Sequence, residues 1–145
     1  MRFLPLLPAL ALGLLAPAAL GQAADPGGAQ LSVEITDIEK PQGELMIALF
    51  DEAGYASDKA VAATQVAASG ETATATFRGL APGRYGIKLF HDVNGNGKMD
   101  TNPFGMPTEP FAFSNNAPAR FGPASWADAA FEVGATGATQ TIKLN

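Results

Sequence analysis

Apolar and polar residues alternate along most of the chain after residue 30, and this alternation predicts β-strands. In residues 31–36 every second residue is apolar, which is the period of a half-buried strand. Residues 45–50 (LMIALF) are apolar throughout and predict a central strand covered on both faces. Residues 72–77 alternate threonine with alanine and phenylalanine, a pattern rich in β-branched side chains.

Three segments between these strands carry other signals. Residues 51–59 are mostly polar and predict a loop. In residues 61–67 the alanines favour a helix, whereas the neighbouring short strands favour an edge strand, so both interpretations stay open. Pro82 and Gly83 fit the central positions of a type II turn, which predicts a positive φ at Gly83.

The remaining strands follow this turn. Tyr85, Ile87 and Leu89 share one face of a predicted strand, and apolar alternation returns in residues 131–133 and 142–144. The pattern contains six or seven short strands and no helix longer than two turns. The sequence therefore predicts an all-β fold: an antiparallel β-sandwich of about seven short strands over residues 31–145, transthyretin-like or immunoglobulin-like.

Residues 92–127 break the alternation. This stretch of 36 residues contains five prolines, five asparagines and four glycines, together with five aromatic residues. Leaving five aromatic rings in water would be costly, so we expect an ordered loop insertion that packs over one end of the sandwich. Near its end, Ser125 has the position of an N-cap and predicts a short helical turn.

The first residues have the layout of a secretory signal peptide. Arg2 is followed by an uncharged apolar run over residues 3–20 and then by small residues. Three prolines within the run, and no cationic anchor after it, argue against a transmembrane segment. We predict a signal peptide at residues 1–23, a flexible tail at residues 24–30, a periplasmic or secreted location and no membrane anchor after cleavage.

Composition and charge exclude several classes of protein. Hydrophobic residues make up 47% of the 145 residues and charged residues 16%, which argues against wholesale disorder. The net charge is −5 and Lys and Arg do not cluster, so we expect no nucleic-acid partner. The absence of cysteine excludes disulfides, thiolate metal sites, cysteine nucleophiles and a lipoprotein anchor.

The start of the 92–127 segment has the spacing of a calcium loop. Oxygen-bearing side chains occupy positions 1, 3, 5 and 9, a glycine occupies position 6, and position 7 would contribute its backbone carbonyl. The candidate metal ligands are Asp92, Asn94, Asn96, Lys98 and Asp100.

This loop departs from an EF-hand in two ways. Position 12 is Pro103 instead of a bidentate glutamate, and a strand instead of a helix precedes the loop. A calcium site at residues 92–102 would therefore need an outside ligand, such as Asn102, Glu109 or a distant carboxylate, and would bind weakly. The alternative is a loop in which Asn and Asp side chains bond their own backbone.

Three motifs resemble a known family. They are His91–Asn102 (HDVNGNGKMDTN), Phe113–Ala117 (FSNNA) and Arg120–Pro123 (RFGP), and together they resemble the bacterial domain-of-unknown-function family 2141 over roughly residues 30–145. The turn at Leu80–Tyr85 is similar to one in transthyretin-like and carboxypeptidase-regulatory-like β-sandwiches. The resemblance implies an exported β-sandwich and assigns no catalytic residue.

The remaining candidates concern catalysis and ligand recognition. His91, the only histidine, would centre a small periplasmic hydrolase with Ser114, or a copper site with Met99 and Met106, but no nucleophile-elbow motif surrounds Ser114. A second group has the aromatic, amide and arginine side chains that hold sugars or peptides. Its members are Phe113, Asn115, Asn116, Arg120, Phe121 and Trp126.

The alternative for this second group is structural. Its rings would close the end of the sandwich, and Arg120 would pair with a loop acid such as Asp100. From these observations we expect an exported, non-enzymatic binding or structural module. Its partner would be a glycan, a peptide or an envelope protein, and calcium would be its one cofactor.

Overall fold

The computed structural model describes residues 28–144. The signal peptide predicted at residues 1–23 lies outside this range, as does most of the predicted tail; the first strand begins at Ala29, inside the last part of that tail. The elements are β1 (Ala29–Thr36), β2 (Glu44–Phe50), α1 (Glu52–Ser57), β3 (Ala62–Ala67), β4 (Ala73–Leu80), β5 (Gly83–Asp92), β6 (Phe111–Phe113), the 3₁₀ helix η1 (Ser114–Asn116), α2 (Trp126–Ala129), β7 (Phe131–Val133) and β8 (Ala138–Lys143).

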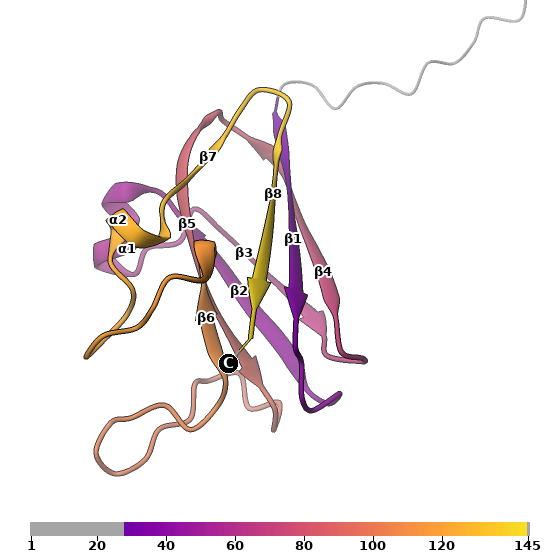
Figure 1. The fold of residues 1–145 in the computed structure, drawn as a ribbon, viewed down its shortest axis with the longest axis vertical. Coiled ribbons are helices and arrows are strands. Elements are labelled where there is room, and N and C mark those ends of the chain that lie inside the picture. The colour runs from indigo at the N-terminus through magenta and orange to yellow at the C-terminus, as the bar shows by residue number, and fades with distance from the viewer. Residues whose placement is uncertain (1–27, 145) are drawn as a thin grey trace, which may run out of the picture.

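The strands form two sheets that pack face to face, which confirms the predicted all-β sandwich (Figure 1). One sheet has the order β4-β1-β8, and the other has the order β3-β2-β5-β6 with β7 also paired to β5. The pairing is antiparallel except between β1 and β8, which run parallel. Within residues 28–144 no helix is long and apolar enough to span a membrane.

The main core lies between the two sheets and follows from the alternation in the sequence. Leu31, Val33 and Ile35 are each 0% exposed, because every second residue of β1 faces the other sheet. Ile87 on β5 and Ile142 on β8 are equally buried from the two sides. This core fixes the register of the strands, since a slip by one residue would turn each apolar set to water.

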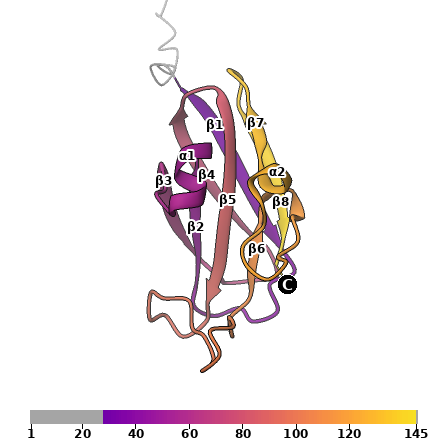
Figure 2. The ribbon, with the colours of Figure 1, turned by 90° about the vertical axis from the view of Figure 1, so that its left-hand side faces the viewer.

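A second, smaller core lies on the outer face of the five-stranded sheet. It contains Phe50, Tyr55 and Phe113, with Trp126 packed against them. Both short helices contribute to it, and Figure 2 shows α1 and α2 against that face. Gly86 on β5 makes room for the cluster, because a Cβ atom there would lie 3.0 Å from the Tyr55 ring and 3.1 Å from that of Trp126.

The structure corrects two local predictions and decides a third. Residues 51–59 are not a simple loop: Asp51 caps α1 by accepting the Gly54 N–H at 2.7 Å. The positive φ before β5 belongs to Gly79, at 71°, and not to Gly83, which begins the strand. Residues 62–67 form the edge strand β3 and not a helix.

The 92–127 segment is ordered in two different ways. Its second part contains β6, which pairs with residues 88–90 of β5, while β7 pairs with residues 83–85 of the same strand. The chain between β6 and β7 leaves the sheet and returns, and it includes the helical turn predicted at Ser125, whose Oγ accepts the Asp128 N–H at 3.2 Å. The first part, residues 93–110, extends from the end of β5 (Figure 1).

Candidate functional site

The candidate calcium loop begins at Asp92, the last residue of β5. Asp92 is only 2% exposed, and its two carboxylate oxygens accept backbone N–H groups. Oδ1 accepts from Asn96 at 3.2 Å, and Oδ2 accepts from Gly97 at 2.7 Å. Gly97 has a φ of 77°, a left-handed conformation in which a residue with a side chain would be strained. The buried carboxylate therefore organises the turn.

The two asparagines of the loop each bond in two directions. Their side-chain oxygens accept backbone N–H groups, Asn94 from Asn96 at 3.2 Å and Asn96 from Lys98 at 2.9 Å. Their amide nitrogens both donate to the carboxylate of Asp100, from Asn96 at 2.7 Å. These contacts are the Asx-turn arrangement, in which the loop satisfies its own polar groups.

Glu109 closes the loop from its far end. Its carboxylate accepts the N–H groups of Val93 at 3.1 Å and of Asp100 at 3.0 Å, and the residue is 8% exposed. Thr108 adds a backbone bond of 2.8 Å to the Asp100 carbonyl. Glu109 was one of the outside ligands considered for a calcium ion. In the structure its carboxylate bonds both ends of the turn at residues 93–100.

The oxygen groups of this loop offer a cation few free positions. Residues 28–144 contain no group of three or more His, Asp or Glu side chains placed to hold a metal ion. Both Asp92 oxygens already accept N–H groups, so a cation would have to compete with them. Amide and backbone oxygens would have to complete its coordination, which is the donor set of a weak calcium site.

His91 and Ser114 are both buried and both fasten the chain. His91 is 1% exposed, and its Nε2 lies 2.6 Å from the carbonyl oxygen of Gln42, so Nε2 carries the proton and donates. Ser114 is 0% exposed; its hydroxyl donates to the Ala129 carbonyl and accepts the Ile87 N–H at 2.9 Å. The Ser114 hydroxyl thereby acts as the partner of the β5 backbone at Ile87, between the residues that pair with β6 and those that pair with β7.

The two amides proposed for ligand recognition join the insertion to β8. Asn115 donates through its amide nitrogen to the carbonyls of Asp128 and Ala130, at 3.1 and 2.9 Å, and exchanges bonds with the Gln140 side chain. The side-chain oxygen of Asn116 accepts the Lys143 N–H at 2.8 Å. Both residues have positive φ, 58° and 51°, which asparagine tolerates better than most residues.

The aromatic members of that group separate in space. Phe113 is buried in the second core, whereas Phe121 is fully exposed and Arg120 is exposed beside it. Trp126 packs against Tyr55 with ring centroids 5.5 Å apart. Residues 28–144 contain no ion pair between Arg120 and Asp100; the two pairs present there are Lys88–Asp58 and Lys143–Asp37. The six residues therefore do not line one surface.

The family assignment rests on a match that covers most of the chain. The model of a family described as an uncharacterized protein conserved in bacteria, DUF2141, matches residues 33–142. The chain belongs to the DUF2141 family. This match confirms the resemblance and covers both sheets together with the whole 92–127 segment. No curated protein and no solved structure matches the chain.

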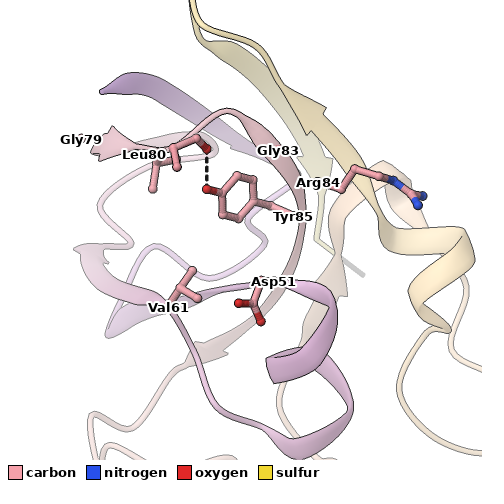
Figure 3. A pocket seen from close by; sticks show the side chains of 8 residues that line it. Asp51, Val61, Gly79, Leu80, Gly83, Arg84 and Tyr85 are labelled. Atoms are coloured by element: carbon pink, nitrogen blue, oxygen red, sulfur yellow. Dashed lines mark hydrogen bonds between the residues drawn. The ribbon is translucent and has the colours of Figure 1, made fainter. Parts of the chain in front are cut away.

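This DUF2141 member also has a hollow that the sequence did not reveal. It holds about 400 Å³ and lies at the start of β5, at the opposite end of that strand from the Asp92 loop (Figure 3). Tyr85 forms part of its wall and donates to the Ala81 carbonyl at 2.5 Å. The charged neighbours are engaged elsewhere: Asp51 caps α1, and the Arg84 guanidinium lies 5.8 Å from the Trp126 ring centre.

The electrostatics of the second core centre on Tyr55 and Lys88. Burial raises the pKa of Tyr55 to about 12, and the carboxylates of Asp128 and Asp58 add to the rise. The Tyr55 hydroxyl donates to the Ala124 carbonyl at 2.7 Å. The Lys88 ammonium donates to the Tyr55 carbonyl at 2.8 Å and pairs with Asp58 at 2.5 Å, which holds α1 against β5.

Proposed function

We propose that this DUF2141 member is an exported, non-enzymatic β-sandwich module that takes up calcium weakly in the loop at residues 92–102. The export part rests on the apolar segment at residues 3–20, with its small residues near position 21. The non-enzymatic part is supported by His91 and Ser114, whose buried side chains are already engaged with backbone groups. Its surface partner is a glycan, a peptide or an envelope protein.

One observation carries the calcium part of the proposal. The side-chain oxygens of Asp92 and Asp100 belong to one closed turn, and the Glu109 carboxylate bonds that turn at Val93 and Asp100. Carboxylate and amide oxygens are the ligands that calcium prefers. Since these oxygens already accept hydrogen bonds, binding exchanges contacts, and we expect a dissociation constant on the order of 10⁻⁴–10⁻³ M.

Calcium in this role would hold the loop and would not react. A loop that is fixed before it meets a partner loses less conformational entropy on binding. The exposed tip of the same segment, with Phe104 at 90% and Met106 at 62% exposure, would lose less entropy on binding a partner once calcium held the loop. Asn102 already orders this tip, because its side-chain oxygen accepts the N–H groups of both residues, at 2.9 and 3.0 Å.

Thermal unfolding in a calcium titration tests the proposal. At about 10 mM calcium and a dissociation constant near 1 mM, the free energy of unfolding should rise by about 1.4 kcal/mol. Magnesium at the same concentration should give a smaller rise, because it tolerates irregular coordination poorly. Asp100→Asn should remove most of the calcium response, whereas Glu132→Gln, an exposed substitution on β7, should keep it. An unfolding temperature unchanged by millimolar calcium would refute the site.

A further inference from the structure

The free edges of the two sheets are protected to different degrees. On β8 the insertion covers the edge, because Asn116 accepts the Lys143 N–H and Asn115 bonds Gln140. The edge strands β6 and β7 have only three residues each. The edge strand β4 carries a charge among its exposed residues, at Arg78. Short strands, covered edges and charges are the usual protections against pairing with another chain.

The edge strand β3 has none of these protections. It is six residues long and has a regular register with β2. The Ala68 N–H donates to the Gly43 carbonyl in that same register, so the even-numbered residues of β3 direct their backbone groups toward β2. Ala63, Gln65 and Ala67 therefore direct theirs outward, and these three residues are exposed. Within residues 28–144 β3 pairs with no strand other than β2, so this outward edge has no ladder partner.

The sequence around β3 is complementary to itself in the antiparallel direction. Residues 60–70 carry no charge, while Lys59 precedes them and Glu71 follows them. The negative charge of Asp58, next to Lys59, is already paired with Lys88, so it does not offset the positive charge of Lys59. A two-fold axis through Gln65 sets Ala63 opposite Ala67 of the second copy. It also brings Lys59 of one copy and Glu71 of the other, which flank the strand, to the same end of the strand pair.

We propose that β3 pairs antiparallel with β3 of a second copy of this chain, with Gln65 on the two-fold axis. The outward residues then exchange about six backbone hydrogen bonds. The two five-stranded sheets become continuous, and the half-buried Thr64 and Val66 gain cover along their open side. Charges of opposite sign meet at each end of the strand pair, which favours this antiparallel register.

Sedimentation equilibrium of the purified protein, up to about 1 mM, tests the pairing, since an interface of one strand pair is smaller than a standard stable interface. Wild-type protein should form a dimer in a concentration-dependent manner. Gln65→Pro removes an outward N–H and leaves the bonds to β2 intact, so it should weaken dimerisation at least tenfold while the dilute monomer keeps its unfolding temperature. Gln65→Ala, which retains the N–H, is the matched control and should stay within a few-fold of wild type.

A charge swap tests the register independently. Lys59→Glu and Glu71→Lys should each weaken dimerisation roughly tenfold, because each places like charges opposite each other twice in the dimer. The double variant should recover the wild-type constant. A wild-type protein that stays monomeric over the whole range would overturn the proposal, and so would a dimer that Gln65→Pro leaves unchanged or a double variant that stays as weak as the singles.

Discussion

The two halves of the unusual segment between β5 and β7 are ordered by different forces. Residues 92–109 use polar groups: two carboxylates and three amides bond the loop's own backbone, and the apolar side chains at its tip stay in water. Residues 110–130 combine apolar burial, with Phe113 in the second core and Trp126 packed against it, with side-chain bonds to the backbone of other elements. The compositions differ in the same sense: residues 92–109 contain one aromatic residue and no alanine, whereas residues 110–130 contain four aromatic residues and seven alanines. The apolar content of each half, and not the proline and asparagine that both contain, separates the two kinds of order.

The difference has a consequence for stability. Burial of a ring supports the whole fold, because β6 pairs with β5 in the sheet and α2 packs against β5. Hydrogen bonds inside the 92–109 loop support mainly that loop, because most of them join residues within it. Substitutions in the second half should therefore lower global stability, and substitutions in the first half should loosen a local region.

The largest effect should come from the buried ring of the second half. Phe113→Ala should lower the free energy of unfolding by about 3–4 kcal/mol, because it empties the centre of the second core. Phe111→Ala, at a half-buried ring 5.9 Å from that of Phe113, is the matched control and should cost roughly half as much. Denaturant unfolding measures both values. A negligible loss for Phe113→Ala would mean that the second core does not bear on global stability.

Alkaline pH should weaken the same half. The pKa of Tyr55 is raised to about 12 in the folded protein from the ordinary tyrosine value of 10.0. Between these pH values the unfolded chain loses the proton first, so the stability present below pH 10 falls as pH rises, by about 2–3 kcal/mol by pH 12. Tyr55→Phe should remove this part of the slope, which chemical denaturation at a series of pH values would measure. A wild-type slope identical to that of Tyr55→Phe would contradict the assignment.

An intermediate effect should follow from the closing carboxylate of the first half. Glu109→Gln leaves one backbone N–H facing an amide nitrogen and should cost about 2 kcal/mol. Hydrogen exchange should speed up at the amides of Val93 and Asp100 more than in β1. Glu132→Gln on the exposed face of β7 should leave both amides unchanged. If exchange rises equally throughout the protein, the loop is not a separate unit.

The sequence predicts the sheets better than it predicts the insertion. Alternation placed β1, β4 and β5, because burial of every second residue leaves a local pattern, and the unbroken apolar run at residues 45–50 placed β2. The parallel pairing of β1 with β8 left no such pattern, since it joins the two ends of the domain. The helix α1 had a local signal, an N-capping Asp51 before Glu52, but its burial depends on Tyr55 reaching a face of β5 that Gly86 leaves open.

The candidate sites show the same limit. The Asp92 loop could be predicted because its ligands follow one another along the chain, and Glu109 could be named only among several outside groups. The aromatic and amide group was predicted as one surface from residue types. Asn115 and Asn116 instead bond α2 and β8, contacts that depend on the position of β8 beside η1. The amide side chain that could bind a ligand can equally bond a backbone group, and the sequence does not show which backbone groups the fold brings near.

The smallest effect should come from the exposed members of the insertion. Phe121→Ser should change the free energy of unfolding by less than about 0.5 kcal/mol, because its ring has no burial to lose. Phe104→Ser at the loop tip should be equally neutral, since its backbone N–H, which Asn102 holds, is unchanged. Both variants can therefore be screened for lost binding to glycans or peptides without a folding defect. A marked loss of stability in Phe121→Ser would mean that its ring packs against the protein in solution. Residues 120–122 would then belong to the buried part of the second half.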